Sequence, residues 1–321
     1  SRWRGNGKSQ RTEKGKTMNE NYAVLQAAAS FVGGEVRTDA AGKADLFVVF
    51  EPDTQDKAPA FGGKNRLLMG KYESCERLGG LHSLPLEEPK TGLTFDAAAE
   101  AVLQKGLGYH LMTIAEWALL CERGSAEADG RTGQSTKAAT GSGTWFYAHS
   151  AKWTGVWDAA GNVREWVCGY RTVDGEIQLI PENGAADAEP DELGSQSMLF
   201  KAISKSGAFV EPGTEGTLKW RYESGQTWLD VATKKESANR TAKLEEIRVA
   251  EGIQQTALNL LETYGIAPGK KGTISYNTSG ERLAAVGACY KDEHAGLRVL
   301  CGTYTRKSTP EEVGVRICYT D

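Results

Sequence analysis

The sequence has no apolar run that approaches the roughly 20 residues a helix needs to cross a bilayer. It also lacks the large positive excess typical of nucleic-acid binders, since its formal net charge is −4. Its six cysteines form no C-x-x-C pair, which excludes the usual zinc-knuckle and thioredoxin-like motifs. We therefore expect a protein that neither inserts into a membrane nor binds nucleic acid.

Histidine is scarce, and the four histidines are too scattered along the chain to form a metal-binding pair. They are His82, His110, His149 and His294. We expect no metal and no cofactor, and a packing role for His110, which comes just before a helix. A chain of 321 residues does not need disulfides, so we expect buried free thiols at Cys75, Cys121, Cys168, Cys289, Cys301 and Cys318.

The composition, with 40% hydrophobic and 25% charged residues, is that of a soluble globular protein. Residues 1–18 are basic and polar without the apolar core of a signal peptide, so we expect a flexible arm on a protein synthesised in the cytoplasm. Residues 19–66 form a small N-terminal β segment in this interpretation, and residues 67–321 form one domain. Residues 187–265 read as an insertion into that domain.

Two helices and a hairpin are predicted by local patterns. Residues 94–106, TFDAAAEAVLQKG, carry an apolar stripe that Gly106 ends. Residues 113–124, TIAEWALLCERG, begin with a capping-box pair at Thr113 and Glu116, and Trp117, Leu120 and Cys121 face inward. The sequence RTVDGEIQLI alternates around a DG pair at residues 174–175, which predicts a type I′ hairpin.

The remaining elements are less regular. Residues 46–50 and 67–72 are strand candidates, and residues 242–265 have the apolar spacing of a third helix. Val313, Val315, Ile317 and Tyr319 alternate as one face of a closing strand. The polar stretch 127–145 is expected to be a surface loop. Short strands, few helices and 38 glycines together predict an α+β fold rather than a doubly wound one.

The order of the motifs is more specific than any one of them. HLMTIAEW at 110–117 is followed by GNVREWV at 161–167, RTVDGEIQLIP at 171–181 and GVR at 314–316. This series resembles the variable proteins of diversity-generating retroelements, known from phage tail tips. Those proteins have the C-type lectin fold in the variant shared with formylglycine-generating enzymes. The resemblance covers about residues 67–185 and 276–319.

The resemblance implies a hypervariable segment near the C-terminus, here about residues 287–316. Its framework would include Ala295 to Leu297, Leu300, Gly314 and Arg316. The implied ligand-binding residues are Tyr290, Lys291, Asp292, Glu293, His294, Arg298, Cys301, Thr303, Tyr304, Ser308, Pro310 and Glu312. Their mixed charges and hydroxyls suit a solvent-facing recognition surface.

The function implied by the resemblance is display of a binding surface. The expected partners are a protein or glycan on a host or neighbouring cell surface and other tail proteins of a virion. The expected location is therefore the virion tail tip, or a cell surface after assembly. A fixed, never diversified tail or structural module on the same fold is the alternative. One sequence does not separate the two, because variability is a property of many sequences.

Enzymatic activity is not expected. The glutamates of the AEW and REW motifs, Glu116 and Glu165, are interpreted as structural hydrogen-bond acceptors, and Asp158 and Asn162 as turn residues. A copper oxidase of the formylglycine-generating type would need two neighbouring cysteines before the closing motif, but Cys289 and Cys301 are far apart in the sequence. The EPN and WND motifs of calcium-dependent lectins are absent, and sugar binding without calcium stays open.

Overall fold

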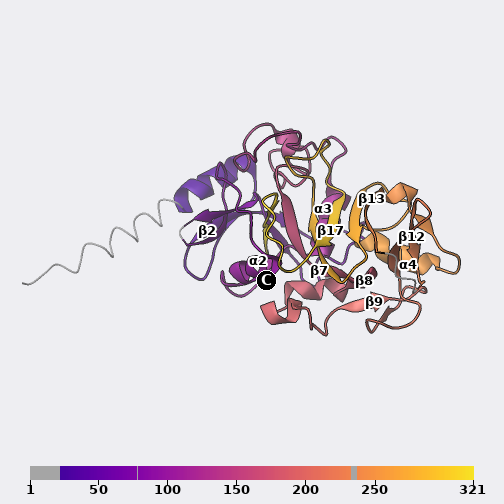
Figure 1. The fold of residues 1–321 in the computed structure, drawn as a ribbon. Helices are drawn as coiled ribbons and strands as arrows, with labels where there is room; N and C mark the ends of the chain where they lie inside the picture. Colours follow the sequence, from indigo (N-terminus) through magenta and orange to yellow (C-terminus); the bar gives the residue numbers. More distant parts are fainter. Residues whose placement is uncertain (1–21, 78, 233–236) are drawn as a thin grey trace, which may run out of the picture.

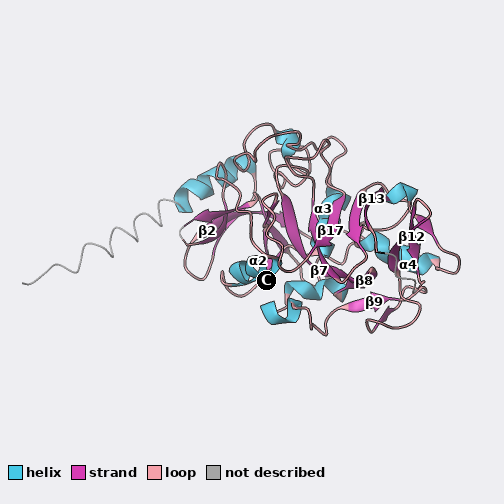
Figure 2. Cartoon of the chain, viewed as in Figure 1, coloured by secondary structure: helices cyan, strands magenta, loops and turns pink. Residues whose placement is uncertain are grey.

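The computed structural model describes residues 22–77, 79–232 and 237–321, so the predicted arm, residues 1–18, lies outside the described residues. Helices and strands alternate irregularly along the chain, which confirms the α+β prediction (Figure 2). Strand β2 lies at the left of Figure 1, the elements β12, β13 and α4 lie at the right, and strand β17 lies between them. No described helix is long and apolar enough to span a bilayer.

The smaller main sheet joins the two ends of the chain. Its strands follow the order β1-β2-β3-β19-β6, and every neighbouring pair is antiparallel. The strands are β1 (Glu35–Thr38), β2 (Ala44–Phe50), β3 (Leu67–Gly70), β6 (Tyr109–Leu111) and β19 (Ile317–Thr320). Both N-terminal strand predictions are confirmed. Because β2 pairs with β3, residues 44–50 continue the sheet that holds the C-terminal strand. A separate hairpin pairs β4 (Ser74–Arg77) with β5 (Gly80–Ser83).

The larger sheet has the order β13-β15-β17-β16-β7-β8-β11-β12-β14, and β9, β10 and β18 pair at its side. Its strands are β7 (Arg164–Val173), β8 (Glu176–Leu179), β9 (Lys201–Ile203), β10 (Phe209–Val210), β11 (Lys219–Glu223), β12 (Gln226–Asp230), β13 (Asn239–Lys243), β14 (Arg248–Val249), β15 (Thr273–Asn277), β16 (Glu281–Val286), β17 (Val299–Tyr304) and β18 (Val313–Gly314). The insertion thus supplies β9 to β14 and extends this sheet rather than forming a loop.

The first two predicted helices are confirmed. Helix α2 (Phe95–Leu103) begins at Thr94, whose side chain accepts a hydrogen bond from the backbone of Ala97. Helix α3 (Ile114–Arg123) begins with the predicted capping box of Thr113 and Glu116. A further helix spans residues 22–32, and short 3-10 turns occur at Trp145–Tyr147, Pro181–Ala186, Pro190–Leu193 and Leu244–Glu246. The loop predicted over residues 127–145 carries no helix or strand up to residue 144, and its last residue, Trp145, begins a 3-10 turn.

The predicted hairpin joins β7 to β8, with Val173 opposite Glu176. Both turn residues have positive φ, 49° at Asp174 and 84° at Gly175, as a type I′ turn requires. A Cβ at Gly175 would lie 2.8 Å from the carbonyl oxygen of Trp220 on β11. Glycine is therefore required here both by the turn and by the close approach of the next strand.

The third predicted helix is mostly wrong. Only Gln255–Thr263 is helical and forms α4, whereas residues 244–246 make a 3-10 turn and residues 248–249 form β14. Gly252 has a φ of 85°, which interrupts any continuous helix. The apolar spacing reflects burial of Leu244 and Ile247 from a short 3-10 turn and the residue after it, which periodicity alone does not distinguish from a longer helix.

The closing strand is broken in two. Val313 and Gly314 form β18 beside β7, and β19 begins at Ile317 in the other sheet. The chain therefore passes from one sheet to the other at Val315 and Arg316. The predicted apolar face is still present, since Val313, Val315, Ile317 and Tyr319 all belong to the same core cluster.

Candidate ligand-binding surface

The C-terminal segment 287–316 contains an irregular loop that is tied to the scaffold by its main chain. Between β16 and β17, the amide of Tyr290 donates to the carbonyl oxygen of Asn162 at 2.7 Å, and the amide of Gly296 donates to that of Ala160 at 2.9 Å. The long loop over residues 127–144 contributes from the other side, where the amide of Gly133 donates to the carbonyl oxygen of Asp292 at 2.7 Å. Main-chain hydrogen bonds to neighbouring segments therefore help to fix the backbone path of this loop.

Asp158 and Asn162 shape the supporting turn, as predicted. Both have left-handed φ values, 61° and 67°, which Asp and Asn tolerate better than most residues. The Asn162 side chain accepts from the amide of Ala138 at 2.7 Å and donates to Glu73 at 2.5 Å, while Asp158 accepts from the amide of Gly141 at 2.8 Å. These contacts connect the turn to the loop that supports the C-terminal segment.

Arg164, at the start of β7, contacts side chains of the C-terminal segment, although it was not among the predicted binding residues. Its guanidinium donates to both carboxylate oxygens of Asp292, at 2.7 and 2.8 Å, and to the sulfur of Cys289 at 3.0 Å. Burial alone would lower the pKa of Arg164, but the neighbouring Cys289, Tyr304 and Asp292 raise it. The sequence feature that could have identified Arg164 is its position inside the GNVREWV motif, whose other residues were interpreted as framework.

Several predicted binding residues gather around Arg164. Lys291 forms an ion pair with Glu312 at 3.3 Å, and the Tyr304 hydroxyl donates to Glu312 at 3.4 Å. The Tyr304 ring packs edge-on against Trp166, with ring centroids 5.1 Å apart. Burial, and the neighbouring Cys301, raise the pKa of Tyr304 well above its usual value. Tyr304 is therefore partly a packing residue and only in part a surface contact.

The predicted binding residues differ in how far their side chains are exposed to solvent. Lys291, Glu293 and His294 are exposed. Asp292, Arg298, Cys301, Thr303, Tyr304, Ser308, Pro310 and Glu312 are half-buried. Tyr290 was expected to face solvent, and this is wrong: it is buried with Val163 and Cys289 in a small apolar cluster. Arg298 lies apart from the Arg164 group and donates to the carbonyl oxygen of Cys121 in α3 at 2.7 Å.

Beneath the segment, Arg316 and Glu165 form a fully buried pair. Arg316 donates to both oxygens of Glu165 and to the carbonyl oxygens of Gly70 and Trp157, the latter two at 2.7 and 2.8 Å. Burial raises the pKa of Glu165, against the effect of Arg316. The closing arginine thus joins both sheets to the Trp157 turn, and the predicted acceptor role of Glu165 is confirmed.

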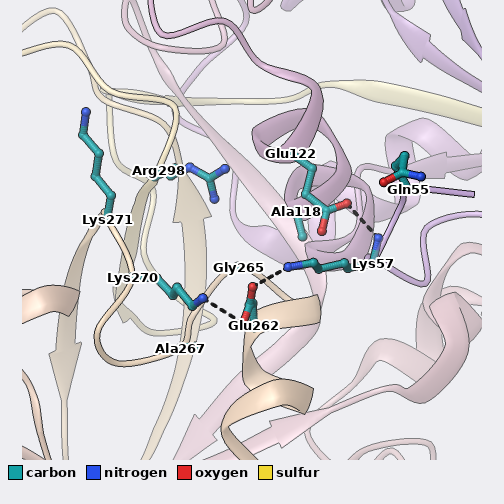
Figure 3. A pocket seen from close by; sticks show the side chains of 10 residues that line it. All are labelled: Gln55, Lys57, Ala118, Glu122, Glu262, Gly265, Ala267, Lys270, Lys271 and Arg298. Atoms are coloured by element: carbon teal, nitrogen blue, oxygen red, sulfur yellow. Dashed lines mark hydrogen bonds and ion pairs between the residues drawn. The ribbon is translucent and has the colours of Figure 1, made fainter. Parts of the chain in front are cut away.

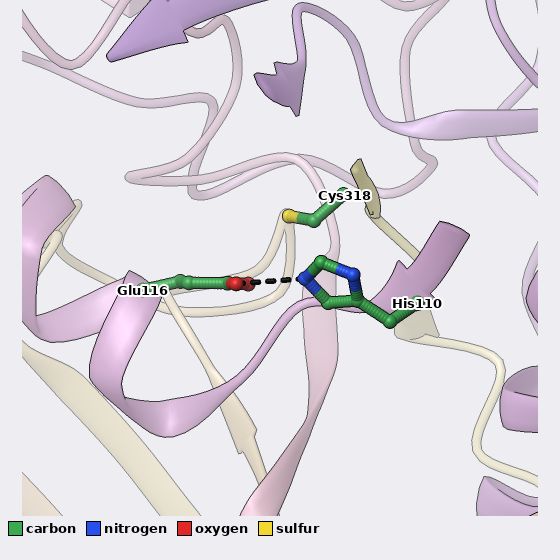
Figure 4. A group of neighbouring side chains, drawn as sticks. All are labelled: His110, Glu116 and Cys318. Atoms are coloured by element: carbon green, nitrogen blue, oxygen red, sulfur yellow. Dashed lines mark hydrogen bonds and ion pairs between the residues drawn. The ribbon is translucent and has the colours of Figure 1, made fainter. Parts of the chain in front are cut away.

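His110, Glu116 and Cys318 form a second buried group, on β6, α3 and β19 (Figure 4). His110 lies 2.7 Å from Glu116, whose oxygens also accept from the amide of Thr113 at 2.9 Å and from Asn183 at 3.1 Å. Burial lowers the pKa of His110 and raises that of Glu116, but their attraction outweighs burial, so the pKa of His110 is raised and that of Glu116 lowered. Hydrogen bonding accounts for both side chains.

Two groups have the composition of metal sites. The ligand atoms of His110, Glu116 and Cys318 lie within 4.8 Å of one another, as do those of Asp39, Asp45 and His82. In the group of Asp39, Asp45 and His82, Lys105 already supplies a positive charge, 3.2 Å from Asp39 and 2.8 Å from Asp45. In the group of His110, Glu116 and Cys318, hydrogen-bond donors already occupy both oxygens of Glu116. These contacts explain both groups without an ion.

The fold brings Cys289 and Cys301 to the same arginine, although they are far apart in the sequence. Both sulfurs contribute to the electrostatic environment of Arg164. Burial raises the pKa of Cys289, so its thiol is protonated, and the adjacent guanidinium repels a metal cation. All six cysteines are free, as expected, and five of them are buried, whereas Cys301 is half-buried.

No family model matches this sequence, and no curated protein matches it. Among solved structures, Treponema denticola variable protein 1 is similar, with a TM-score of 0.39 and 9% identity. The similarity covers 90% of this chain and 99% of that chain. At this TM-score and identity, the similarity establishes neither a shared fold nor a shared function.

Proposed function

We propose that this protein is a ligand-binding display protein with the C-type lectin fold, whose C-terminal surface is diversified by a retroelement. The motif order from HLMTIAEW to GVR is the basis for the family. The observation that carries the proposal is that exposed Lys291, Glu293 and His294 stand on a loop whose main chain is hydrogen-bonded to fixed neighbours.

Such an arrangement separates folding from recognition. The side chains of Glu293 and His294 make no hydrogen bond or ion pair with any residue that the structure describes, so their replacement removes no internal contact. Surface substitutions of this kind usually change the free energy of unfolding by less than about 0.5 kcal/mol. Binding specificity can therefore change while Arg164, Glu165 and Arg316 keep the scaffold intact.

The proposed ligand is a protein or glycan on a host or neighbouring cell surface, and the protein acts by binding rather than by catalysis. A surface burying about 800 Å² on each partner is the standard size for specific recognition. Several copies on one particle, for example at a virion tail tip, would raise the overall affinity through multivalency. No cofactor is required for this activity.

Sequencing the part of the gene that encodes residues 164–316 across a natural population tests the proposal. We expect substitutions at Lys291, Glu293, His294 and Ser308, traceable to template adenines, and an invariant Arg164, Gly314 and Arg316. Tyr290, which is buried, should vary little. A uniform segment in every member of the population would contradict diversification and favour a fixed recognition or structural module.

A further inference from the structure

A charged cleft of about 440 Å³ lies between α3 and the turn that follows α4 (Figure 3). Ala118 and Glu122 of α3 form one wall, and Gly265, Ala267 and Lys270 form the other. Arg298, at the start of β17, points toward the cleft from the C-terminal segment. The cleft therefore joins the insertion to the segment that carries the predicted binding residues.

The cleft continues into a second hollow of about 560 Å³, lined by residues 295–299 of the same segment. Glu122, Lys271 and Arg298 line both hollows, so the two form one groove with these residues at its junction. The charged side chains of the whole groove are Lys57, Lys243, Lys270, Lys271 and Arg298 against Glu122, Glu245 and Glu262. This set leaves an excess of two positive charges.

One excess positive charge lies at the junction, where Lys271 and Arg298 accompany the single carboxylate of Glu122. The other belongs to Lys57 and Lys270, which share Glu262 as an ion-pair partner, at 2.7 Å and 3.0 Å. Within the described part of the chain, Lys271 makes no hydrogen bond or ion pair, and Arg298 makes no ion pair. Two cations that make no ion pair among the described residues thus line both hollows.

A hydrogen bond fixes the position of the Arg298 side chain before a ligand binds. One of its nitrogens donates to the carbonyl oxygen of Cys121 at 2.7 Å, which positions the guanidinium at the end of α3. The remaining N–H groups of its planar fork match the two oxygens of a carboxylate. Because the side chain is already ordered, binding costs less conformational entropy than it would for a free surface arginine.

The lining distinguishes between anionic ligands. Glu122, Glu245 and Glu262 would repel a dense polyanion such as a polyphosphate chain, whereas an excess of two charges suits one or two carboxylates. Neither hollow is lined by an aromatic side chain, the surface on which the C–H face of a sugar ring packs best. An acidic peptide fits this lining better than an acidic glycan.

We infer that the groove binds an acidic peptide segment of a protein ligand, with Arg298 and Lys271 contacting its carboxylates. This deepens the proposed function and rests on it in taking the C-terminal segment as a recognition surface. The inference also assigns a role to the insertion, whose helix α4 supplies Glu262 and leads into the turn that forms one wall of the groove.

A fluorescence-anisotropy titration of the full chain with a labelled heptapeptide of alternating glycine and glutamate tests the inference. The matched peptide carries glutamine in place of glutamate, and an oligogalacturonate provides carboxylates on a glycan. We expect the glutamate peptide alone to bind, and binding to weaken roughly tenfold or more in Lys271→Gln and in Arg298→Gln. Lys152→Gln, which replaces an exposed lysine outside the groove, should bind as the wild type does.

Equal binding of both peptides, unchanged binding in both variants, or binding of the oligogalacturonate alone would overturn the inference. Since Lys271 has no internal partner, its variant should keep the wild-type melting temperature, so a loss of binding there is not a loss of folding. Failure here leaves the population-sequencing result untouched. Conversely, a uniform gene segment would refute diversification without affecting peptide binding in the groove.

Discussion

Trp166 and Trp117 are the residues on which the core near the C-terminal segment depends most. Trp166 is fully buried, donates to the carbonyl oxygen of Leu93 at 3.1 Å and packs on Phe95 and Tyr304. Trp117 is 2% exposed and donates to the carbonyl oxygen of Leu297, in the C-terminal segment itself. Both indoles therefore contact the C-terminal segment, Trp166 through Tyr304 and Trp117 through Leu297.

Replacing either tryptophan with alanine should destabilise the protein strongly, because a large cavity replaces each ring. We expect Trp166→Ala or Trp117→Ala to lower the free energy of unfolding by about 3–5 kcal/mol. Trp145→Ala, whose side chain is 42% exposed, should cost about 1 kcal/mol or less. Chemical denaturation measures all three. Equal losses for the buried and exposed residues would contradict the assigned packing.

His149 should make the protein acid-sensitive. Its Nδ1 accepts from the amide of Val156 at 2.9 Å, and burial lowers its pKa from 6.5 to about 4. The unfolded chain therefore takes up a proton between about pH 6.5 and pH 4 that the folded chain does not, so stability falls as the pH falls through this window. In His149→Asn, the amide oxygen can still accept the hydrogen bond from Val156, but the side chain takes up no proton in this pH range.

We therefore expect the stability difference between the wild type and His149→Asn to decrease on acidification from pH 7 to pH 4, by roughly 3 kcal/mol at most. Denaturation curves at several pH values measure it. A difference that stays constant over this range would show that His149 is not held in its neutral form.

At the residue scale, the sequence identified the framework better than the exposed positions. Glu116, Glu165, Asp158 and Asn162 were interpreted as structural, and their hydrogen bonds agree. Tyr290 was misassigned because burial depends on Val163 and Cys289, which the fold brings to it. Arg164 was missed because its partner Asp292 is distant in the sequence and no local pattern predicts the contact.

Among the elements, helix α3 has the strongest local signal, and Thr113 begins it. The Thr113 hydroxyl accepts from the amide of Glu116 at 3.1 Å and donates to Asn183 at 2.5 Å. We expect Thr113→Ala to cost about 1–2 kcal/mol, because both the cap and a buried hydrogen bond are lost. Thr113→Ser keeps the hydroxyl and should lose less than half of this in thermal denaturation. Equal losses in the two variants would assign the effect to the methyl group instead.

Local chemistry predicted those elements whose ends are marked by caps and turn residues. Helix α3 has a capping box, and the β7–β8 hairpin has the DG pair, so both were predictable. Helix α4 was predicted too long because apolar spacing continues across Gly252 into β14. The break in the closing strand depends on the buried Arg316–Glu165 pair, which joins the two sheets and leaves no local signal.

For the whole molecule, the sequence indicated an α+β protein but not how its parts join. The insertion extends the sheet of β7 and β8 through β11, a pairing between residues 176 and 219 that no short-range pattern predicts. The N-terminal strands join the C-terminal strand β19 in the same sheet for a similar reason. Long-range strand pairing was therefore the part of the fold beyond sequence-based prediction.

In the proposed function, the C-terminal segment presents replaceable side chains on a fixed scaffold. The most direct test is a library randomised at Lys291, Glu293, His294 and Ser308, compared with one randomised at buried Leu300, Val313, Val315 and Arg316. Protease resistance reports folding, and selection against unrelated protein targets reports binding.

We predict that most members of the first library stay as protease-resistant as the parent and that some bind new targets, whereas most members of the second unfold. Widespread unfolding in the first library, or an absence of binders among its folded members, would contradict the claim.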